Sequence, residues 1–178
     1  MEDYDHPATA SINEYLHTSY RPDVDYVDGE LQDRLWGEFP HSAVRTELLS
    51  MLRVRCEPFG MKVLPSIRVR VSLTRIRIAD VAVLKAAWRK TQIIEEAPAL
   101  CIEVVEPQDD MERVQGRCRD FLKMGVPEVW IFDPEERTVF VVTDGRTTEQ
   151  RTGTLQLDGT EVQVNLEALF AVLDEGQA

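Results

Sequence analysis

The stretch from residue 100 to residue 133 constrains the fold most, because it reads as strand, helix, strand. LCIEVV and EVWIFD are short apolar runs of strand length, and the segment between them has helical spacing. Its apolar residues fall on one helical face: Met111, Val114, Cys118, Phe121 and Leu122. Gly125 supplies a C-cap, and Pro127 prevents the helix from continuing. Such a unit is a right-handed crossover, so we expect the two strands to be parallel.

The segments on the N-terminal side predict two helices and a hairpin. SINEYLHTSY reads as a short helix, with Ser11 as N-cap and Glu14 completing a capping box. The Asp28-Gly29 dipeptide predicts a tight turn between two strand pieces. HSAVRTELLSMLRVRCEPFG carries apolar residues at helical spacing and ends at Gly60.

The whole order of elements favours an α/β (α+β) fold. KVLPSIRVRVSL and IRIADVAVL are two more strands, and TVFVVT, shorter strands and the helix NLEALFAVL close the chain. We expect a mixed central β-sheet flanked by helices, with an N-terminal helix and a small C-terminal β extension. The 178 residues suit one domain over residues 1–178. Its core would span about residues 10–145, and the extension with its helix residues 146–173.

The composition is that of an ordinary soluble globular protein, with 43% apolar and 29% charged residues. No apolar run approaches the roughly 20 residues of a membrane span. The N-terminus MEDYDHPATA lacks the basic and then apolar layout of a signal peptide. We therefore expect a cytoplasmic protein with no membrane contact.

The cysteines give no sign of a metal or disulfide framework. Cys56, Cys101 and Cys118 are odd in number, widely spaced and without a CxxC pair. Each is expected to pack as a small buried hydrophobe.

The formal net charge is −12, from 20 basic and 32 acidic residues, which argues against a broad basic surface for nucleic acid. One local basic stripe lies on the hairpin of the KVLPSIRVRVSL and IRIADVAVL strands: Arg68, Arg70, Arg75 and Arg77. These arginines could contact phosphates. Arginines on an exposed hairpin face also serve solubility, and the sequence leaves both roles open.

Two carboxylates interrupt strands that otherwise look buried. Asp80 lies within IRIADVAVL and Glu103 within LCIEVV. Glu30 is a third acidic residue in an apolar strand, but it follows the Asp28-Gly29 turn and is the least anomalous. A buried charge is costly unless it is paired or binds a metal. Pairing with an arginine would explain either residue alone. Two carboxylates on successive strands favour a shared divalent cation, because Mg²⁺ prefers oxygen ligands and usually takes one or two carboxylates plus waters.

At this point the chain resembles a known family. YVDGEL, PHSAVRTELL, RIRIADVAVL, CIEVVEP and GRCRDFLKMGVPEVWIFDPEERTV occur in the order typical of the bacterial Uma-two family, over roughly residues 10 to 145. That family is a branch of the PD-(D/E)xK nuclease fold, so the resemblance implies a restriction-endonuclease-like fold. It also implies a site that binds Mg²⁺ or Mn²⁺.

The resemblance assigns roles residue by residue. Asp80 matches the aspartate of the PD element, and Glu103 matches the acidic residue of the (D/E)xK strand. Glu30 matches the glutamate of the DGE segment, which reaches the metal in related nucleases. His41 matches a histidine common at the start of the long helix, where capping or surface exposure is the alternative role.

The chain departs from the family at the lysine. In this branch the lysine is displaced to the helix after the strand, at a position that Arg117 occupies here. Val105 stands at the usual strand position, and Ala79 replaces the structural proline. Arginine stays protonated and cannot act as a general base, but it can hold a phosphate oxygen. A structural salt bridge to Glu103 or Asp80 is its alternative role.

These observations favour a metal-dependent endonuclease that hydrolyses phosphodiester bonds, with DNA as the expected substrate. Asp80, Glu103 and Glu30 would bind the metal, and Arg117 would stabilise the phosphoryl transition state. A catalytically weakened or inactive nuclease-fold protein with a binding or regulatory role is the alternative. A phosphoester or small-ligand enzyme of another kind has only the carboxylates in its favour. Cutting both strands usually needs two sites, so we expect a homodimer. The EVWIFD and TVFVV strands could give it an apolar surface, although the sequence does not show which surface pairs.

Overall fold

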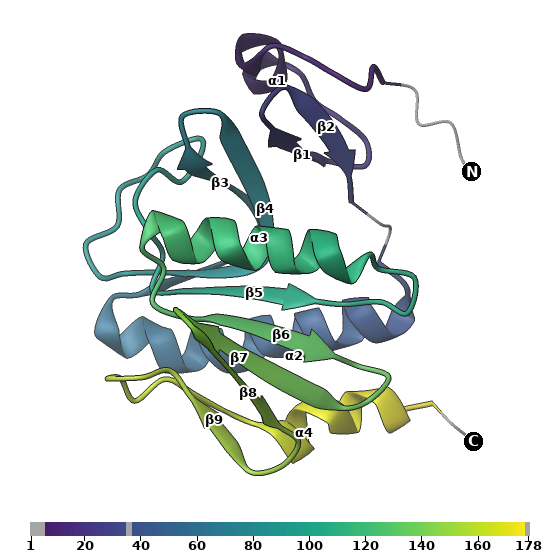
Figure 1. Ribbon diagram of the computed structural model, residues 1–178. Coiled ribbons are helices and arrows are strands. Elements are labelled where there is room, and N and C mark those ends of the chain that lie inside the picture. The colour runs from purple at the N-terminus through teal and green to yellow at the C-terminus, as the bar shows by residue number, and fades with distance from the viewer. Residues whose placement is uncertain (1–5, 35–36, 177–178) are drawn as a thin grey trace.

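A computed structural model of the chain describes residues 6–34 and 37–176. Within them the main sheet has eight strands, in the order β2-β1-β4-β5-β6-β7-β8, with β3 paired to β4 outside that path. These strands are β1 Val24–Val27, β2 Glu30–Asp33, β3 Lys62–Ser72, β4 Arg75–Leu84, β5 Leu100–Val104, β6 Val129–Asp133, β7 Thr138–Thr143 and β8 Arg146–Gln150. A separate pair is β9 Thr154–Gln156 with β10 Gln163–Asn165. The helices are α1 Ile12–His17, α2 Phe39–Cys56, α3 Met111–Met124 and α4 Leu166–Phe170, with 3₁₀ turns η1 Glu57–Phe59 and η2 Ala171–Asp174 (Figure 1).

The main sheet is mixed. β5 and β6 are parallel, paired from Cys101 with Val129 to Val104 with Phe132, and α3 connects them. The other strand pairs in the described residues are antiparallel. The predicted α+β architecture and the predicted parallel pair are confirmed.

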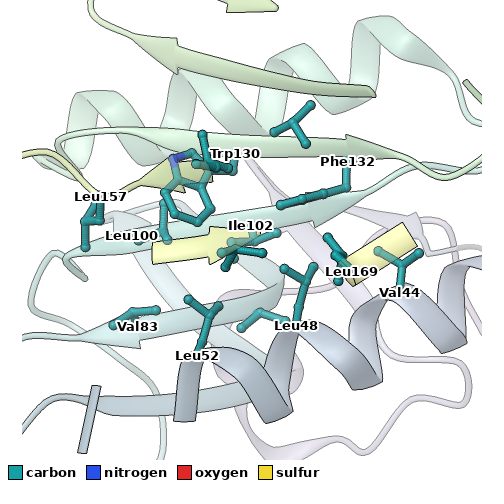
Figure 2. Close-up of a cluster of buried hydrophobic side chains, with 14 of the residues drawn as sticks. Val44, Leu48, Leu52, Val83, Leu100, Ile102, Trp130, Phe132, Leu157 and Leu169 are labelled. Atoms are coloured by element: carbon teal, nitrogen blue, oxygen red, sulfur yellow. The ribbon is translucent and has the colours of Figure 1, made fainter. Parts of the chain in front are cut away.

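The two long helices cover opposite faces of this sheet (Figure 1). Leu48 of α2 and Ile102 of β5 belong to one core cluster, which Figure 2 shows. Phe121 of α3 and Cys101 of β5 belong to another. Because neighbours along a strand point to opposite faces, Glu103 lies on the α3 side with Cys101. No helix among the described residues is long and apolar enough to cross a membrane.

Local signals in the sequence give the expected elements. The capping box at the start of α1 is present. Asp28 and Gly29 have φ angles of 53° and 101°, the left-handed backbone that a tight hairpin turn requires. The long helix α2 begins at Phe39, two residues before His41, because Pro40 suits a first helical turn.

The C-terminal segment is part of the core. β8 extends the main sheet beside β7, whereas β9 and β10 pair with each other. Leu155 of β9, Val164 of β10 and Leu169 of α4 join the cluster beneath α2. Residues 146–173, expected as a small extension, therefore close one side of the α2 core.

The strand EVWIFD is not available as a dimer surface, and that expectation is wrong. β6 lies between β5 and β7 in the sheet. Trp130 and Phe132 are buried in the α2 cluster, and Ile131 is buried in the α3 cluster. Both faces of the strand are therefore covered by the same chain. On the neighbouring strand β7, Phe140 and Val142 are only partly buried.

The three cysteines are buried and form no disulfide, as expected. Burial raises the pKa of the Cys56 thiol to about 11 and that of Cys118 to about 12. Both thiols are therefore protonated at neutral pH, which suits small packing residues and not nucleophiles.

Candidate active site

Asp80 and Glu103 meet on adjacent antiparallel strands. The β4–β5 register pairs Val81 with Ile102. Asp80 and Glu103 occupy the next positions along the two strands. The Asp80 carboxylate also bonds to β5, because its Oδ2 accepts the N–H of Val104 at 2.9 Å. Asp80 is 6% exposed and Glu103 is fully buried.

Arg34 bridges the two carboxylates. It follows the last residue of β2, and its side chain is 13% exposed. One terminal nitrogen, Nη2, donates to Asp80 Oδ1 at 2.6 Å, and the other, Nη1, donates to Glu103 Oε2 at 3.0 Å. A single guanidinium therefore lies across the pair that the sequence predicts as a metal site.

Arg117 approaches the same pair from α3. Its Nε donates to Glu103 Oε2 at 2.7 Å, and the side chain is 9% exposed. The alternative role of a salt bridge to Glu103 is thus present in the structure. Two guanidinium charges, those of Arg34 and Arg117, balance the two carboxylates of Asp80 and Glu103.

Burial and charge shift the two carboxyl groups in opposite directions. Burial favours the neutral acid of Asp80, but the Arg34 charge and nearby His41 outweigh it, so the pKa of Asp80 lies well below its ordinary value. Burial raises the pKa of Glu103, against the opposing charges of Arg117 and Arg34. The pKa of Arg34 is raised, because the attraction of the two carboxylates exceeds the effect of its burial.

His41 is buried in the first turn of α2 beside Asp80. Its Nε2 lies 3.6 Å from Asp80 Oδ2, and its Nδ1 has no hydrogen-bond partner among the described residues. Gly37 allows this close packing, since a Cβ at that position would lie 2.7 Å from His41 Nδ1. The histidine therefore contacts the carboxylate pair and is not a surface residue.

A cavity of about 270 Å³ opens beside these groups. Its lining residues are Asp33, Arg34, His41, Asp80, Val104, Glu106, Gln108, Asp109, Asp110, Arg113 and Arg117. The cavity gives a polar ligand access to Asp80, and Glu103 lies directly behind its partners Arg34 and Arg117.

The structure does not bring Glu30 to this site, which corrects its expected place beside the metal. Glu30 is exposed at the start of β2 and pairs with Val27 of β1, which pairs with Arg75 of β4. Two strand spacings are about 10 Å, and the five residues from Arg75 to Asp80 span about 17 Å. Glu30 therefore lies too far from Asp80 to share an ion with it.

The four arginines of the hairpin stripe all face carboxylates. Arg77 is buried between Asp25 at 3.1 Å and Asp120 at 2.7 Å, and Arg75 reaches the same Asp120 at 3.0 Å. Arg68 pairs with Asp23, and Arg70 lies 3.5 Å from Glu95. Ion pairing, not a free basic surface, accounts for their concentration here.

Sequence reasoning missed three charged residues of this region. Arg34 carried no signal, because it lies 46 and 69 positions from its two partners. Asp25 is buried between apolar neighbours in β1, an interruption of the same kind as Asp80. Glu106 is 7% exposed and accepts the N–H of Glu38 ahead of α2.

The chemical type of the donor atoms in the carboxylate pair suits a hard divalent cation. Asp80 and Glu103 offer the oxygen donors that Mg²⁺ and Mn²⁺ prefer, and Glu103 Oε1 is buried without a hydrogen-bond partner among the described residues. No group of three or more His, Cys, Asp or Glu residues converges for a metal in the part of the chain that the structure describes. These residues therefore suit an ion held by two carboxylates and several waters. Arg34 contacts both of the carboxylates.

Comparisons with known proteins agree with this fold. A family model described as "Putative restriction endonuclease" (Uma2) matches residues 12–172. The crystal structure of "a putative nuclease belonging to DUF820" from Anabaena variabilis ATCC 29413 is similar, with a TM-score of 0.83 and 22% identity over 94% of this chain and 99% of that one. That similarity shows a shared fold.

A weaker similarity links the chain to the DrdV–DNA complex, with a TM-score of 0.37 and 9% identity over 78% of this chain and 14% of that one. Nothing about this chain follows from so low a score. No curated protein matches it. The family match nevertheless covers most of the 178 residues, including every residue of the carboxylate pair and its partners. The chain therefore belongs to the Uma2 family of putative restriction endonucleases.

Proposed function

We propose that this protein is a metal-dependent endonuclease that hydrolyses phosphodiester bonds in DNA. The observation that carries the proposal is the meeting of the Asp80 and Glu103 carboxylates at a polar cavity, in a chain of a nuclease family. Asp80 and Glu103 would hold Mg²⁺ or Mn²⁺. Such an ion, when bound, polarises a phosphoryl oxygen and lowers the pKa of a bound water.

Arg117 would bind the scissile phosphate group. Its Nε is engaged by Glu103, while its terminal nitrogens donate to no residue among those described. The side chain lines the cavity, so these nitrogens can donate to a phosphoryl oxygen there. The charge stays positive throughout, which suits stabilisation of developing negative charge and excludes a general-base role.

His41 and the N–H of Val104 would position Asp80. They contact Oδ2, whereas the Asp80 Oδ1 atom faces Arg34. Both partners favour the ionised carboxylate, which is the form that binds a cation.

A weakened or inactive nuclease fold is the second candidate. The observation in its favour is the balance of two carboxylates by Arg34 and Arg117, which leaves the site neutral without any metal. On this hypothesis the protein binds nucleic acid or another partner and leaves it intact.

Cleavage of supercoiled plasmid DNA with Mn²⁺ separates the two candidates. We expect the wild-type protein to cleave the plasmid and Asp80→Asn to lose at least about 100-fold in rate, because the variant lacks one of two metal ligands. Asp28→Asn is the matched control, since it removes an exposed carboxylate at the β1–β2 turn.

Equal cleavage by wild type and Asp80→Asn would reject the assigned site. A folded wild-type protein that leaves both DNA and RNA intact in Mg²⁺ and Mn²⁺ would support the inactive alternative instead.

A further inference from the structure

We infer that Arg34 is an internal cation that competes with the divalent metal for Asp80 and Glu103, so that metal affinity is set by this arginine. The inference rests on the proposed function, because it concerns the same carboxylate pair. It adds a residue that neither the family motif nor the sequence pattern assigns to the site.

The geometry puts the guanidinium where an ion would bridge the pair. Arg34 uses one oxygen of each acid, Asp80 Oδ1 and Glu103 Oε2, through two different nitrogens. A metal ligand oxygen must approach Mg²⁺ to about 2.0–2.1 Å. An ion shared by these two oxygens cannot reach that distance while the planar guanidinium lies between them.

The charge balance points the same way. With Arg34 in place, two guanidinium groups neutralise two carboxylates, and a divalent ion would bring an excess of two positive charges. With Arg34 withdrawn, the group of Asp80, Glu103 and Arg117 has one net negative charge. Since electrostatic energies are large in a buried site, removing the Arg34 charge from this group favours the binding of a cation.

Each of the two carboxylates would keep a partner in the absence of Arg34. If it leaves, Glu103 keeps the 2.7 Å bond from Arg117, and Asp80 keeps the Val104 N–H and the contact with His41.

The cavity offers Arg34 a place to go. Its side chain already lines the cavity, and it makes no hydrogen bond to any described residue besides the two acids. The acidic residues Asp33, Asp109 and Asp110 line the same space, and a bound phosphate would present further oxygens. Movement into the cavity therefore exchanges one set of anionic partners for another.

Isothermal titration with MnCl₂ tests the competition on the full chain. We expect Arg34→Gln to bind Mn²⁺ at least about tenfold more tightly than the wild type, because its amide carries no charge. Arg113→Gln is the matched control, because the substitution removes the same charge from a residue that lines the same cavity. The carboxylate partner of Arg113 is Asp110, not the Asp80–Glu103 pair. The control should change the affinity by less than about threefold.

The outcomes separate this inference from the proposed function. Equal, measurable Mn²⁺ affinity in wild type and Arg34→Gln would overturn the competition and keep the metal site. No Mn²⁺ binding by either protein, with Arg34→Gln shown to be folded by circular dichroism, would overturn both. Loss of the gained binding in an Arg34→Gln/Asp80→Asn double variant would show that the ion binds at this pair.

A measurement on the wild type covers the case in which Arg34→Gln does not fold. The side-chain NMR signal of Arg34 should shift from its metal-free position as Mg²⁺ is added, and the shift should saturate together with that of Asp80. Saturation of the Asp80 signal by Mg²⁺ with no change at Arg34 would overturn the inference.

Discussion

Asp80 and Glu103 lie side by side, yet their surroundings shift their pKa values in opposite directions. Asp80 receives contacts at both oxygens, from Arg34, His41 and a backbone N–H. Glu103 is deeper, and only one of its oxygens is hydrogen-bonded. Burial favours the neutral form of both acids, and only in the partly satisfied Glu103 does it outweigh the neighbouring positive charges.

The lowered pKa of Asp80 predicts how the stability contributed by this residue depends on pH. Because its folded pKa lies below the unfolded value of 3.8, its ionised form stabilises the protein above that pH, and this contribution is lost as the pH falls. We expect Asp80→Asn to lower the free energy of unfolding by about 2 kcal/mol at pH 7, with a smaller loss at pH 3.

Urea unfolding of the wild type and of Asp80→Asn at a series of pH values measures the difference between their free energies of unfolding. The comparison cancels the other acids that lose stabilising partners at low pH, such as Asp28 and Asp174. A gap that stays constant between pH 7 and pH 3 would contradict the assigned pKa shift.

For single residues, the sequence predicts the site positions that follow from strand alternation. It misses those that join the site through contacts between distant parts of the chain. Asp80 and Glu103 stood out because each interrupts an apolar strand. Glu30 was placed through the resemblance alone, and the hairpin geometry carries it away from the site. Arg34 joins the site only through the arrangement of the four strands β2, β1, β4 and β5, which no local pattern encodes.

The element α3 joins the parallel strands and carries Arg117, so the way it ends affects the site. Gly125 caps the helix with a φ of 106°, which side chains with a Cβ rarely adopt. A Cβ added there would lie 3.8 Å from Ala97, an ordinary contact, so the expected cost is in the backbone and not in packing.

We expect Gly125→Ala to destabilise the protein by about 1 kcal/mol. Gly116→Ala in the same helix is the matched control, since Gly116 has no positive φ and a Cβ there would meet only arginine side-chain ends at 3.8 Å. It should stabilise by about 0.5–1 kcal/mol, because alanine favours a helix interior over glycine. Thermal unfolding measures the change in stability for both variants. Changes in the same direction for Gly125→Ala and Gly116→Ala would contradict this account of the cap.

The elements with strong local signals were predicted well, and the weak ones were not. α3, its cap and the flanking strands followed from helical spacing, a glycine and a proline. β9 and β10 are three residues each, too short for a period to appear. Their role in the core depends on contacts with α2, which lies more than 90 positions earlier in the chain.

At the scale of the whole molecule, the largest apolar cluster and the charged groups of the site occupy different parts of the fold. The α2 face buries a large apolar cluster that β9, β10 and α4 complete. The charged groups gather where β4 and β5 meet the first turn of α2 and the middle of α3. Substitutions in the site can therefore be tested without opening the main core, which is why the variants above are expected to fold.

The number of sites in the assembly sets what the protein can cut. Each chain has one Asp80–Glu103 pair, and on the proposed function one such site would serve one phosphodiester bond at a time. Cutting both DNA strands in one encounter needs two sites, so we propose that the protein acts as a homodimer. Light scattering should give a mass about twice the 20.4 kDa of the chain.

The cleavage products provide a second measure of the same prediction. A dimer with two sites should convert supercoiled plasmid to linear DNA with little accumulation of the nicked circle. Mixing wild type with excess Asp80→Asn protein should then form mixed dimers that carry one working site, so nicked circles should accumulate. A scattering mass near that of one chain, with nicked circles as the first product at every protein concentration, would show that the chain acts alone and cuts one strand at a time.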